Sequence, residues 1–313
     1  MFHDPGPVLQ GMSLARRDTH ADNLEAIKLF NRAVTLDPKF AKGWAALSIT
    51  TTIDWENFLY APYQKVRPSV WAAASRAIQF GPHLADGHVA MATIAEYMDW
   101  DLERVAAELH IAGALDPRSI PVIAKAANIA TARGRLDEAA ALARQVIERD
   151  PLSGRAYWWL GQVELHAGRG AEAAEHIRKA IELAPSAAQW HATLAYALIE
   201  DGKTAEAVEA AEQEPDPLFR RTALPIVFDA VGRRADADRE LAAIERQYAA
   251  SAPDFIARIY GYRNDIDNVM PWLERAADAR AGAALYASSD PAFKTMLHEP
   301  RFVGFLHRWK LGE

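Results

Sequence analysis

A short acidic stretch is the first place where residue types and spacing could support chemistry. Asp99, Asp101 and Glu103 are carboxylates at alternate positions, and carboxylates can bind a metal ion or transfer a proton. Such a stretch also fits an exposed turn, with Asp101 accepting hydrogen bonds at the positive end of the helix that follows. We favour the turn, so these acids predict a helix start and not a catalytic site.

The ten histidines do not fall at metal-ligand spacing. His83 and His88 lie five residues apart across a predicted helix start, and the zinc pattern His-Glu-x-x-His does not occur. His166 and His176 belong to different predicted helices. The chain has no cysteine, which excludes disulfides, zinc–thiolate sites and thiol nucleophiles. The sequence therefore predicts no metal site.

Glycine and serine patterns are equally unsuited to catalysis. Residues 168–170 (Gly-Arg-Gly) lack the following glycine and the preceding strand of a dinucleotide-binding loop, and no Walker A loop is present. Ser288 and Ser289 have no nucleophile elbow around them. We expect a protein without catalytic residues or cofactors, which is not an enzyme.

Regularly spaced prolines indicate which elements carry the side chains. A proline restricts the residue before it, so each one predicts a helix end. The prolines are Pro38, Pro82, Pro117, Pro151 and Pro185, with separations of 44, 35, 34 and 34 residues. A period of 34 residues is the length of a tetratricopeptide repeat, which is a pair of antiparallel helices.

The stretch 154–187 resembles the tetratricopeptide family most closely. Small residues stand where helices approach one another, and larger apolar residues fill the spaces between them. Gly168 suits the left-handed residue that ends the first helix of the pair. The matching residues are Leu160, Gly161, Gly168, Ala173, Ile177, Ala180 and Pro185, whereas Glu164 stands where the family often has tyrosine.

Other units keep the pattern with local departures. Residues 19–22 read as a capping box ahead of a helix that runs to Leu36. About ten extra residues near 52–62 predict a long loop or an extended helix end. The prolines at 215–217 predict a break or a bend. Asn264 stands where glycine usually turns the chain, and asparagine tolerates that left-handed geometry.

We therefore predict an all-α fold, a right-handed superhelical solenoid of roughly eight antiparallel helix pairs with a C-terminal capping helix that ends near Trp309. Residues 1–214 are expected to form an N-terminal array of about six pairs, which includes the insertion near 52–62. Residues 215–313 are expected to supply the C-terminal pairs and the cap, continuous with the first array.

Three further features lie outside the repeat pattern. They are residues 9–30 (LQGMSLARRDTHADNLEAIKLF), Asp99-Trp100-Asp101, and SSDPAF with EPRFVGFL near the end. Together they resemble a bacterial tetratricopeptide region that is usually found C-terminal to a signalling module, such as an adenylate or guanylate cyclase, a winged-helix regulator or a protein kinase. The resemblance implies a signalling role, for either a free-standing relative or an excised region.

Composition and charge narrow the choice of partners. Half of the residues are hydrophobic and a quarter are charged, which suits a chain that folds throughout. The net charge of −7 and the absence of a run of Lys and Arg residues argue against nucleic acid as a binding partner. Neither a signal peptide nor an 18-residue uncharged stretch is present, so we expect a cytoplasmic protein without membrane contacts.

In this family the first helix of each pair faces a concave groove, and the resemblance implies that a partner binds there. Aromatic side chains would stack on an extended peptide, and polar groups would bond to its main chain. Alternatively, Trp158 or Trp159 is core between repeats and the polar residues are solvated. Some members of the family bind the C-terminal carboxylate of a partner through a lysine and an asparagine. Here Ala124 stands where that lysine would be expected beside Asn128, so this mode of binding is not predicted. The predicted groove residues are Asn128, Arg155, Trp158, Gln162, Gln189 and Tyr196.

Aromatic residues concentrate in the insertion near 52–62. If exposed, they would form a contact surface. If buried, they would fill a gap between the first two units, which is the interpretation we favour. These residues are Trp55, Phe58, Tyr60 and Tyr63.

The predicted function is a non-catalytic scaffold or regulatory module that binds a protein or peptide partner in the groove. Two alternatives stay open. The first is a small-molecule-sensing domain of a signalling protein, with its pocket between the insertion and the first units. The second is a module that self-associates through its terminal units. The sequence does not identify the partner.

Overall fold

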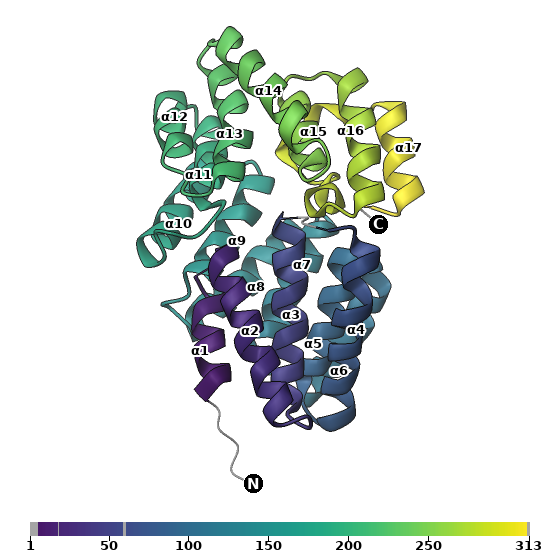
Figure 1. The fold of residues 1–313 in the computed structure, drawn as a ribbon. Helices are drawn as coiled ribbons and strands as arrows, with labels where there is room; N and C mark the ends of the chain where they lie inside the picture. Colours follow the sequence, from purple (N-terminus) through teal and green to yellow (C-terminus); the bar gives the residue numbers. More distant parts are fainter. Residues whose placement is uncertain (1–5, 18, 59–60, 312–313) are drawn as a thin grey trace. The chain divides into compact units, whose positions relative to one another are not determined.

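The computed structural model describes residues 6–17, 19–58 and 61–311, and these residues form helices and turns without a β-strand. Consecutive helices form antiparallel pairs, as α3 and α4 illustrate in Figure 1. The described residues contain eight such pairs in succession, from α1/α2 to α15/α16, and then α17. The predicted all-α fold of tandem helix pairs is confirmed. The chain divides into two compact units, Met1–Ile129 and Ala130–Glu313.

The first unit contains the two longest helices of the described residues, with 18 residues each. Its elements are α1 (Gly6–Ala15), α2 (His20–Leu36), α3 (Ala41–Phe58), α4 (Tyr63–Phe80), α5 (Ala85–Ile94), the π-helix η1 (Ala95–Asp99), α6 (Leu102–Leu115) and most of α7 (Ile120–Ala132).

The second unit continues with more regular pairs and ends in an irregular segment followed by one helix. Its elements are α8 (Leu136–Arg149), α9 (Gly154–His166), α10 (Gly170–Leu183), α11 (Trp190–Glu200), α12 (Thr204–Glu212), α13 (Pro217–Ala230), α14 (Arg234–Tyr248), α15 (Pro253–Tyr262), α16 (Ile266–Ala279), the 3-10 helices η2 (Gly282–Tyr286) and η3 (Pro291–Met296), and α17 (Pro300–Trp309).

Each of the five regularly spaced prolines follows a helix end, as predicted. The residue before the proline leaves the helical conformation while its N–H still donates to the carbonyl four residues earlier, as in the 2.9 Å bond from Asp37 N to Ala33 O. The proline ring then prevents the helix from continuing. The five C-cap residues are Asp37, Gly81, Asp116, Asp150 and Ala184.

Left-handed residues turn the chain inside the later pairs. Gly168 has φ 71° between α9 and α10, a conformation that a side chain would disfavour. Asn264 adopts φ 56° between α15 and α16. The prediction that asparagine replaces glycine at this turn is confirmed.

The insertion near 52–62 lengthens two helices and is not a long loop. α3 and α4 have 18 residues each, and Trp55 is fully buried, with Nε1 donating to Ala61 O at 2.8 Å. Phe58 packs at 4.5 Å from the His20 ring, and Tyr63 joins the hydrophobic core of the first unit. Tyr60 lies outside the described residues. Trp55 therefore fills space between helices, in the way that the buried interpretation predicts.

Both predicted N-terminal caps are present. Thr19 Oγ1 accepts a hydrogen bond from Asp22 N at 3.1 Å, and Asp101 Oδ1 accepts one from Arg104 N at 2.9 Å. Asp99 forms an ion pair with Arg67, whose Nη2 lies 2.8 Å from Asp99 Oδ2. In this acidic stretch, Asp101 therefore begins α6 and Asp99 joins η1 to α4.

The turn at residues 214–217 is tied to the start of α11. Glu214 is fully buried and accepts bonds from the backbone N–H groups of Gln189, at 3.0 Å, and Ala192, at 3.1 Å. Burial raises the pKa of the Glu214 carboxyl. Asp216 caps α13 by accepting from Leu218 N at 2.8 Å. The division of the array after residue 214 stays a prediction.

The C-terminal helix covers the last pair, as predicted. α17 lies beside α16 (Figure 1), and its Phe302 and Phe305 side chains are fully buried. Both rings contribute to one aromatic group with Phe293 of η3, since Phe302 lies 5.5 Å from Phe293 and 6.5 Å from Phe305. The tail therefore completes the core of the second unit.

The close approach of helices gives a test of this packing. A methyl group at Gly170 would lie 2.7 Å from Asp201 N and 2.8 Å from Ala197 O, whereas one at Gly304 would have no neighbour within 4 Å. We expect Gly170→Ala to lower the free energy of unfolding by about 1–3 kcal/mol. Gly304→Ala is the matched control and should be neutral or stabilising by up to about 1 kcal/mol. Urea denaturation measures both, and equal effects would contradict this packing.

Candidate functional site

The first helices of the later pairs form one layer in the second unit. α11 contacts both α9 and α13, and α13 contacts α15. We call the surface of this layer that carries His166, Glu200 and Arg258 the first-helix face. The predicted groove positions on α9 and α11 can be compared with it directly.

Trp158 is half-buried between α9 and α11. Its ring stacks on Trp190 with centroids 6.2 Å apart, and its Nε1 donates to Thr193 Oγ1 at 3.2 Å. Arg155 lies one turn earlier, with its guanidinium 5.9 Å from the Trp159 ring. Trp158 thus packs between repeats, and its role in binding a peptide stays a prediction.

Gln162 and Gln189 come from two neighbouring first helices of this layer. Gln162 is half-buried on α9. Gln189 precedes α11 with φ 76°, and its backbone N–H donates to the buried Glu214. Arg155, Trp158 and Gln162 share α9, so the structure brings these three predicted residues together on one helix.

Tyr196 is placed differently from the prediction that it stacks on a peptide. Its side chain is only 2% exposed. The ring stacks on Tyr262 at 6.1 Å and lies 4.7 Å from the Arg258 guanidinium. Burial raises its pKa to about 12. In this conformation other residues of the chain cover Tyr196, so it offers no surface to a partner.

Asn128 belongs to the first unit, where it lies beside a π-helix. Its Nδ2 donates to Tyr97 Oη at 3.3 Å. Lys125 Nζ is 4.5 Å from the Tyr97 ring and forms an ion pair with the fully buried Glu96. Sequence reasoning missed Glu96, Tyr97 and Lys125.

The proline spacing contained a signal for this π-helix. The interval from Pro82 to Pro117 is 35 residues, one more than the regular period. A π-helix accommodates one extra residue within a helix. Here η1 does so and leaves Trp100 in a left-handed conformation with φ 55°.

An irregular segment of the same chain lies on the first-helix face of the second unit. We call residues 282–297 the C-terminal segment. Ser289 Oγ is 3.0 Å from His166 Nδ1 on α9, and Lys294 Nζ is 2.9 Å from Glu200 Oε1 on α11. Burial lowers the pKa of the His166 imidazole. Sequence reasoning did not foresee that this segment lies against α9 and α11.

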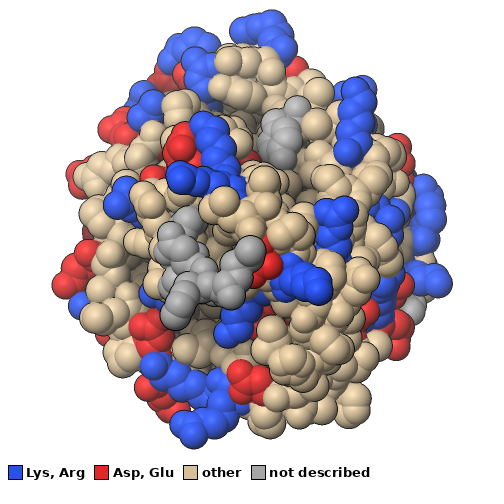
Figure 2. All heavy atoms as spheres, turned by 60° about the horizontal axis from the view of Figure 1, so that its bottom comes forward, with Lys and Arg blue, Asp and Glu red and all other residues tan. Residues whose placement is uncertain are grey.

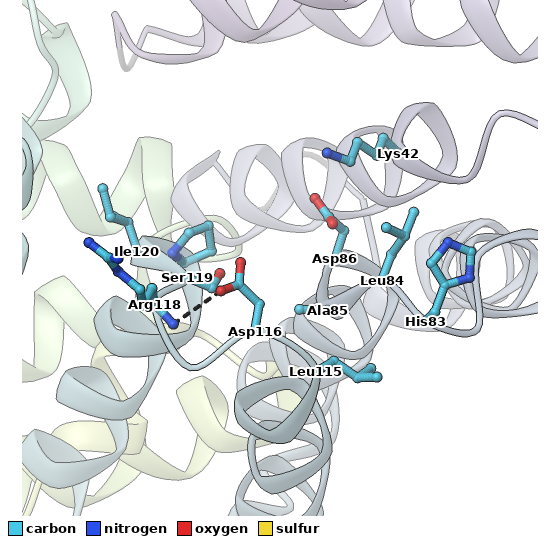
Figure 3. Close-up of a pocket in the computed structure, with 11 residues that line it drawn as sticks. Lys42, His83, Leu84, Ala85, Asp86, Leu115, Asp116, Arg118, Ser119 and Ile120 are labelled. Atoms are coloured by element: carbon cyan, nitrogen blue, oxygen red, sulfur yellow. Dashed lines mark hydrogen bonds between the residues drawn. The ribbon is translucent and has the colours of Figure 1, made fainter.

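A pocket of about 540 Å³ lies at the start of three helices in the first unit. In Figure 3 the side chains of Lys42, from α3, and Asp86, from α5, point toward one another at its edge. Asp116 Oδ1 accepts from Arg118 N at 3.0 Å. The apolar part of the lining comes from Leu84, Ala85, Leu115, Ile120 and Pro121. The residues of the insertion near 52–62 do not line this pocket.

Charges of both signs are mixed over the surface that Figure 2 shows. Within the described ranges, no group of three or more His, Asp or Glu side chains is arranged to hold a metal ion. None of the helices in the part of the chain that the structure covers has the length and hydropathy needed to cross a membrane.

Glu164 is buried where the repeat pattern has tyrosine. The side chain is 2% exposed and lies 2.8 Å from His176 Nδ1 of α10 and 3.4 Å from Arg144 Nη2 of α8. The hydrogen bond to Glu164 raises the pKa of the His176 imidazole. A charged contact therefore joins neighbouring pairs at this position.

The comparisons with known proteins support a tetratricopeptide repeat protein. Residues 125–188 match the family described as tetratricopeptide repeat, and a comparison with curated proteins found no match. Several solved structures share the fold, at sequence identities that show the fold alone.

Three of these structures cover most of this chain. A chain of the APC/C hetero-tetramer Cut9–Hcn1 has a TM-score of 0.65 and 11% identity, covering 97% of this chain and 55% of that one. The human IFIT1 dimer with m7Gppp-AAAA has a TM-score of 0.58 and 16% identity, and the match covers 87% of this chain and 71% of the IFIT1 chain. Pseudomonas aeruginosa pilF has a TM-score of 0.50 and 16% identity, and the match covers 67% of this chain and 95% of the pilF chain.

The His176–Glu164 contact predicts a pH dependence of stability. Because the folded state raises the pKa of His176 above 6.5, the contact stabilises the protein fully below pH 6.5 and is lost as the pH rises through the folded-state value. The natural chain should therefore be more stable than His176→Gln below pH 6.5. This difference in unfolding free energy should fall as the pH rises from 6.5 through the folded-state pKa of His176. Urea denaturation at several pH values measures it. In a Glu164→Gln background the fall should disappear, and its persistence there would contradict the assignment.

Proposed function

We propose that this protein is a non-catalytic scaffold or regulatory module whose first-helix face binds an extended segment of a protein partner. The observation that carries the proposal is the C-terminal segment itself. The second unit already holds an irregular stretch of polypeptide on this face, through side chains from α9, α11 and α15. Side chains at that face can therefore bind a segment made of turns and short 3-10 helices.

The protein-binding role also fits the architecture. Repeat arrays offer extended surfaces built from equivalent positions of successive units. The structural neighbour Cut9 was solved in a hetero-tetramer with Hcn1. The resemblance of the sequence to regions found beside signalling modules favours a regulatory role, and the cytoplasm is the proposed location.

The proposed contacts for a partner lie on α9 and at the start of α11. Arg155, Gln162 and Gln189 supply hydrogen bonds to the main chain of the partner, and Trp158 supplies apolar contact at its exposed part. Asn128 is a further proposed contact, on the first unit. Tyr196 is omitted because it is buried.

Peptide-display selection on the immobilised protein tests this function. We expect Arg155→Ala and Gln162→Ala to weaken binding of a selected peptide at least fivefold, because each removes a hydrogen-bond donor from α9. Arg178→Ala is the matched control, since Arg178 lies on the second helix of the same pair and pairs with the exposed Glu206. Fluorescence anisotropy measures the affinities. If all three variants lose affinity for the peptide equally, or if none of them loses affinity, the proposed binding face is wrong.

The pocket in the first unit favours small-molecule sensing as a second candidate function. Charged groups at its edge and apolar residues in its lining offer a small molecule both polar and apolar contacts. If this pocket binds a metabolite, a thermal-shift screen should find a compound that raises the Tm of the natural chain, because such a ligand binds only the folded state. The shift should disappear in Asp86→Ala and persist in Arg155→Ala. A shift that Asp86→Ala leaves intact would place the compound elsewhere.

A further inference from the structure

The C-terminal segment contains an Asp-Pro-Ala-Phe turn, residues 290–293, whose acidic and aromatic side chains are both buried. We infer that the first-helix face of the second unit is a recognition site for a partner segment with an Asp-Pro-x-Phe turn, and that this chain's own turn occupies the site in cis. The inference rests on the proposed peptide-binding function and adds the chemistry of the ligand.

The acid of the turn has one cationic partner. Arg258 of α15 is 8% exposed and Asp290 is 4% exposed, with Nε and Oδ2 3.0 Å apart. Asp290 Oδ1 also accepts from Ala292 N at 2.9 Å, which caps the first turn of η3 at Pro291. One carboxylate therefore both shapes the turn and anchors it to α15. The rings of Tyr196 and Phe255 flank the guanidinium at 4.7 and 5.9 Å.

The aromatic residue of the turn lies where α15 has no side chain. Phe293 is 1% exposed. A methyl group at Gly261 would lie 2.8 Å from the Phe293 ring and 2.7 Å from Ala292 O. The missing side chain at 261 thus makes room for both the ring and the backbone of the turn. A site built this way selects an aromatic residue three positions after the acid.

Polar contacts flank the turn on both sides. Ser289, just before the turn, is hydrogen-bonded to His166, and Lys294, just after the turn, forms an ion pair with Glu200. Thr295 Oγ1 donates to Asn264 Oδ1 at 2.7 Å. A buried anchor with a polar rim is the usual composition of a peptide-binding site.

The turn is held in cis by contacts that a partner segment can also make. A partner with the same acid and the same aromatic residue can pair with Arg258 and place its ring against Gly261, so it can compete with the turn.

A labelled peptide of the chain's own residues 287–296, Ala-Ser-Ser-Asp-Pro-Ala-Phe-Lys-Thr-Met, tests the inference. In the full chain, Asp290→Ala removes the anchor in cis and should raise the affinity for this peptide at least tenfold over the natural chain. Fluorescence anisotropy measures binding, and circular dichroism checks that the variant is folded. The same peptide with alanine in place of its aspartate should bind at least tenfold more weakly. Asp267→Ala, on the exposed side of α16, is the matched control and should leave the affinity unchanged.

Adding Arg258→Leu to Asp290→Ala should abolish the gained binding. If folded Asp290→Ala binds the peptide no better than the natural chain does, the inference is wrong. If Asp290→Ala does not fold, hydrogen exchange of the natural chain decides instead. Amides of residues 287–296 should then exchange at least tenfold faster than those of residues 302–306, and equal rates would overturn the inference. Selected peptides that bind through Arg155 while this peptide fails would refute the inference and leave the proposed function standing.

Discussion

Close contact between helix backbones at small residues is the constraint on which the rest of this structure depends. A methyl group at Gly161 would lie 2.5 Å from Ile177 Cγ1, and one at Gly170 would lie within 3 Å of the backbone of the next pair. At such distances a side chain cannot be inserted without moving a helix. Fully buried alanines such as Ala173 and Ala180 serve the same purpose.

Polar groups that fall within these contacts must find partners inside the protein. Glu96, Glu164 and Glu214 are each at least 98% buried, and an unpaired carboxylate at such a place would be costly. Glu96 is paired with Lys125, Glu164 with His176 and Arg144, and Glu214 with backbone N–H groups. These contacts join neighbouring elements, so the buried acids link helices of the array.

The C-terminal segment gives the array its most specific feature. In a uniform array the first helices would present equivalent surfaces along their length. Here Arg258, Gly261 and His166 hold an irregular stretch of the chain, so the later pairs differ from the earlier ones. The surface of α9 that carries Arg155 and Gln162 lies in the same unit. The contacts proposed for a partner and the contacts with the chain's own turn thus lie on the same layer of helices.

The sequence by itself determined the helix pairs and their limits. Each proline ends a helix by a local steric effect, so the C-caps could be predicted, and the intervals of 44 and 35 residues contained the long α3/α4 pair and the π-helix. The placement of Trp158 and Tyr196 required the tertiary structure. Trp158 stacks on Trp190 of the next pair. Tyr196 stacks on Tyr262 of α15, and Ser289 reaches His166 across 123 residues. Local patterns fix where helices begin and end, but such contacts depend on where distant segments pack.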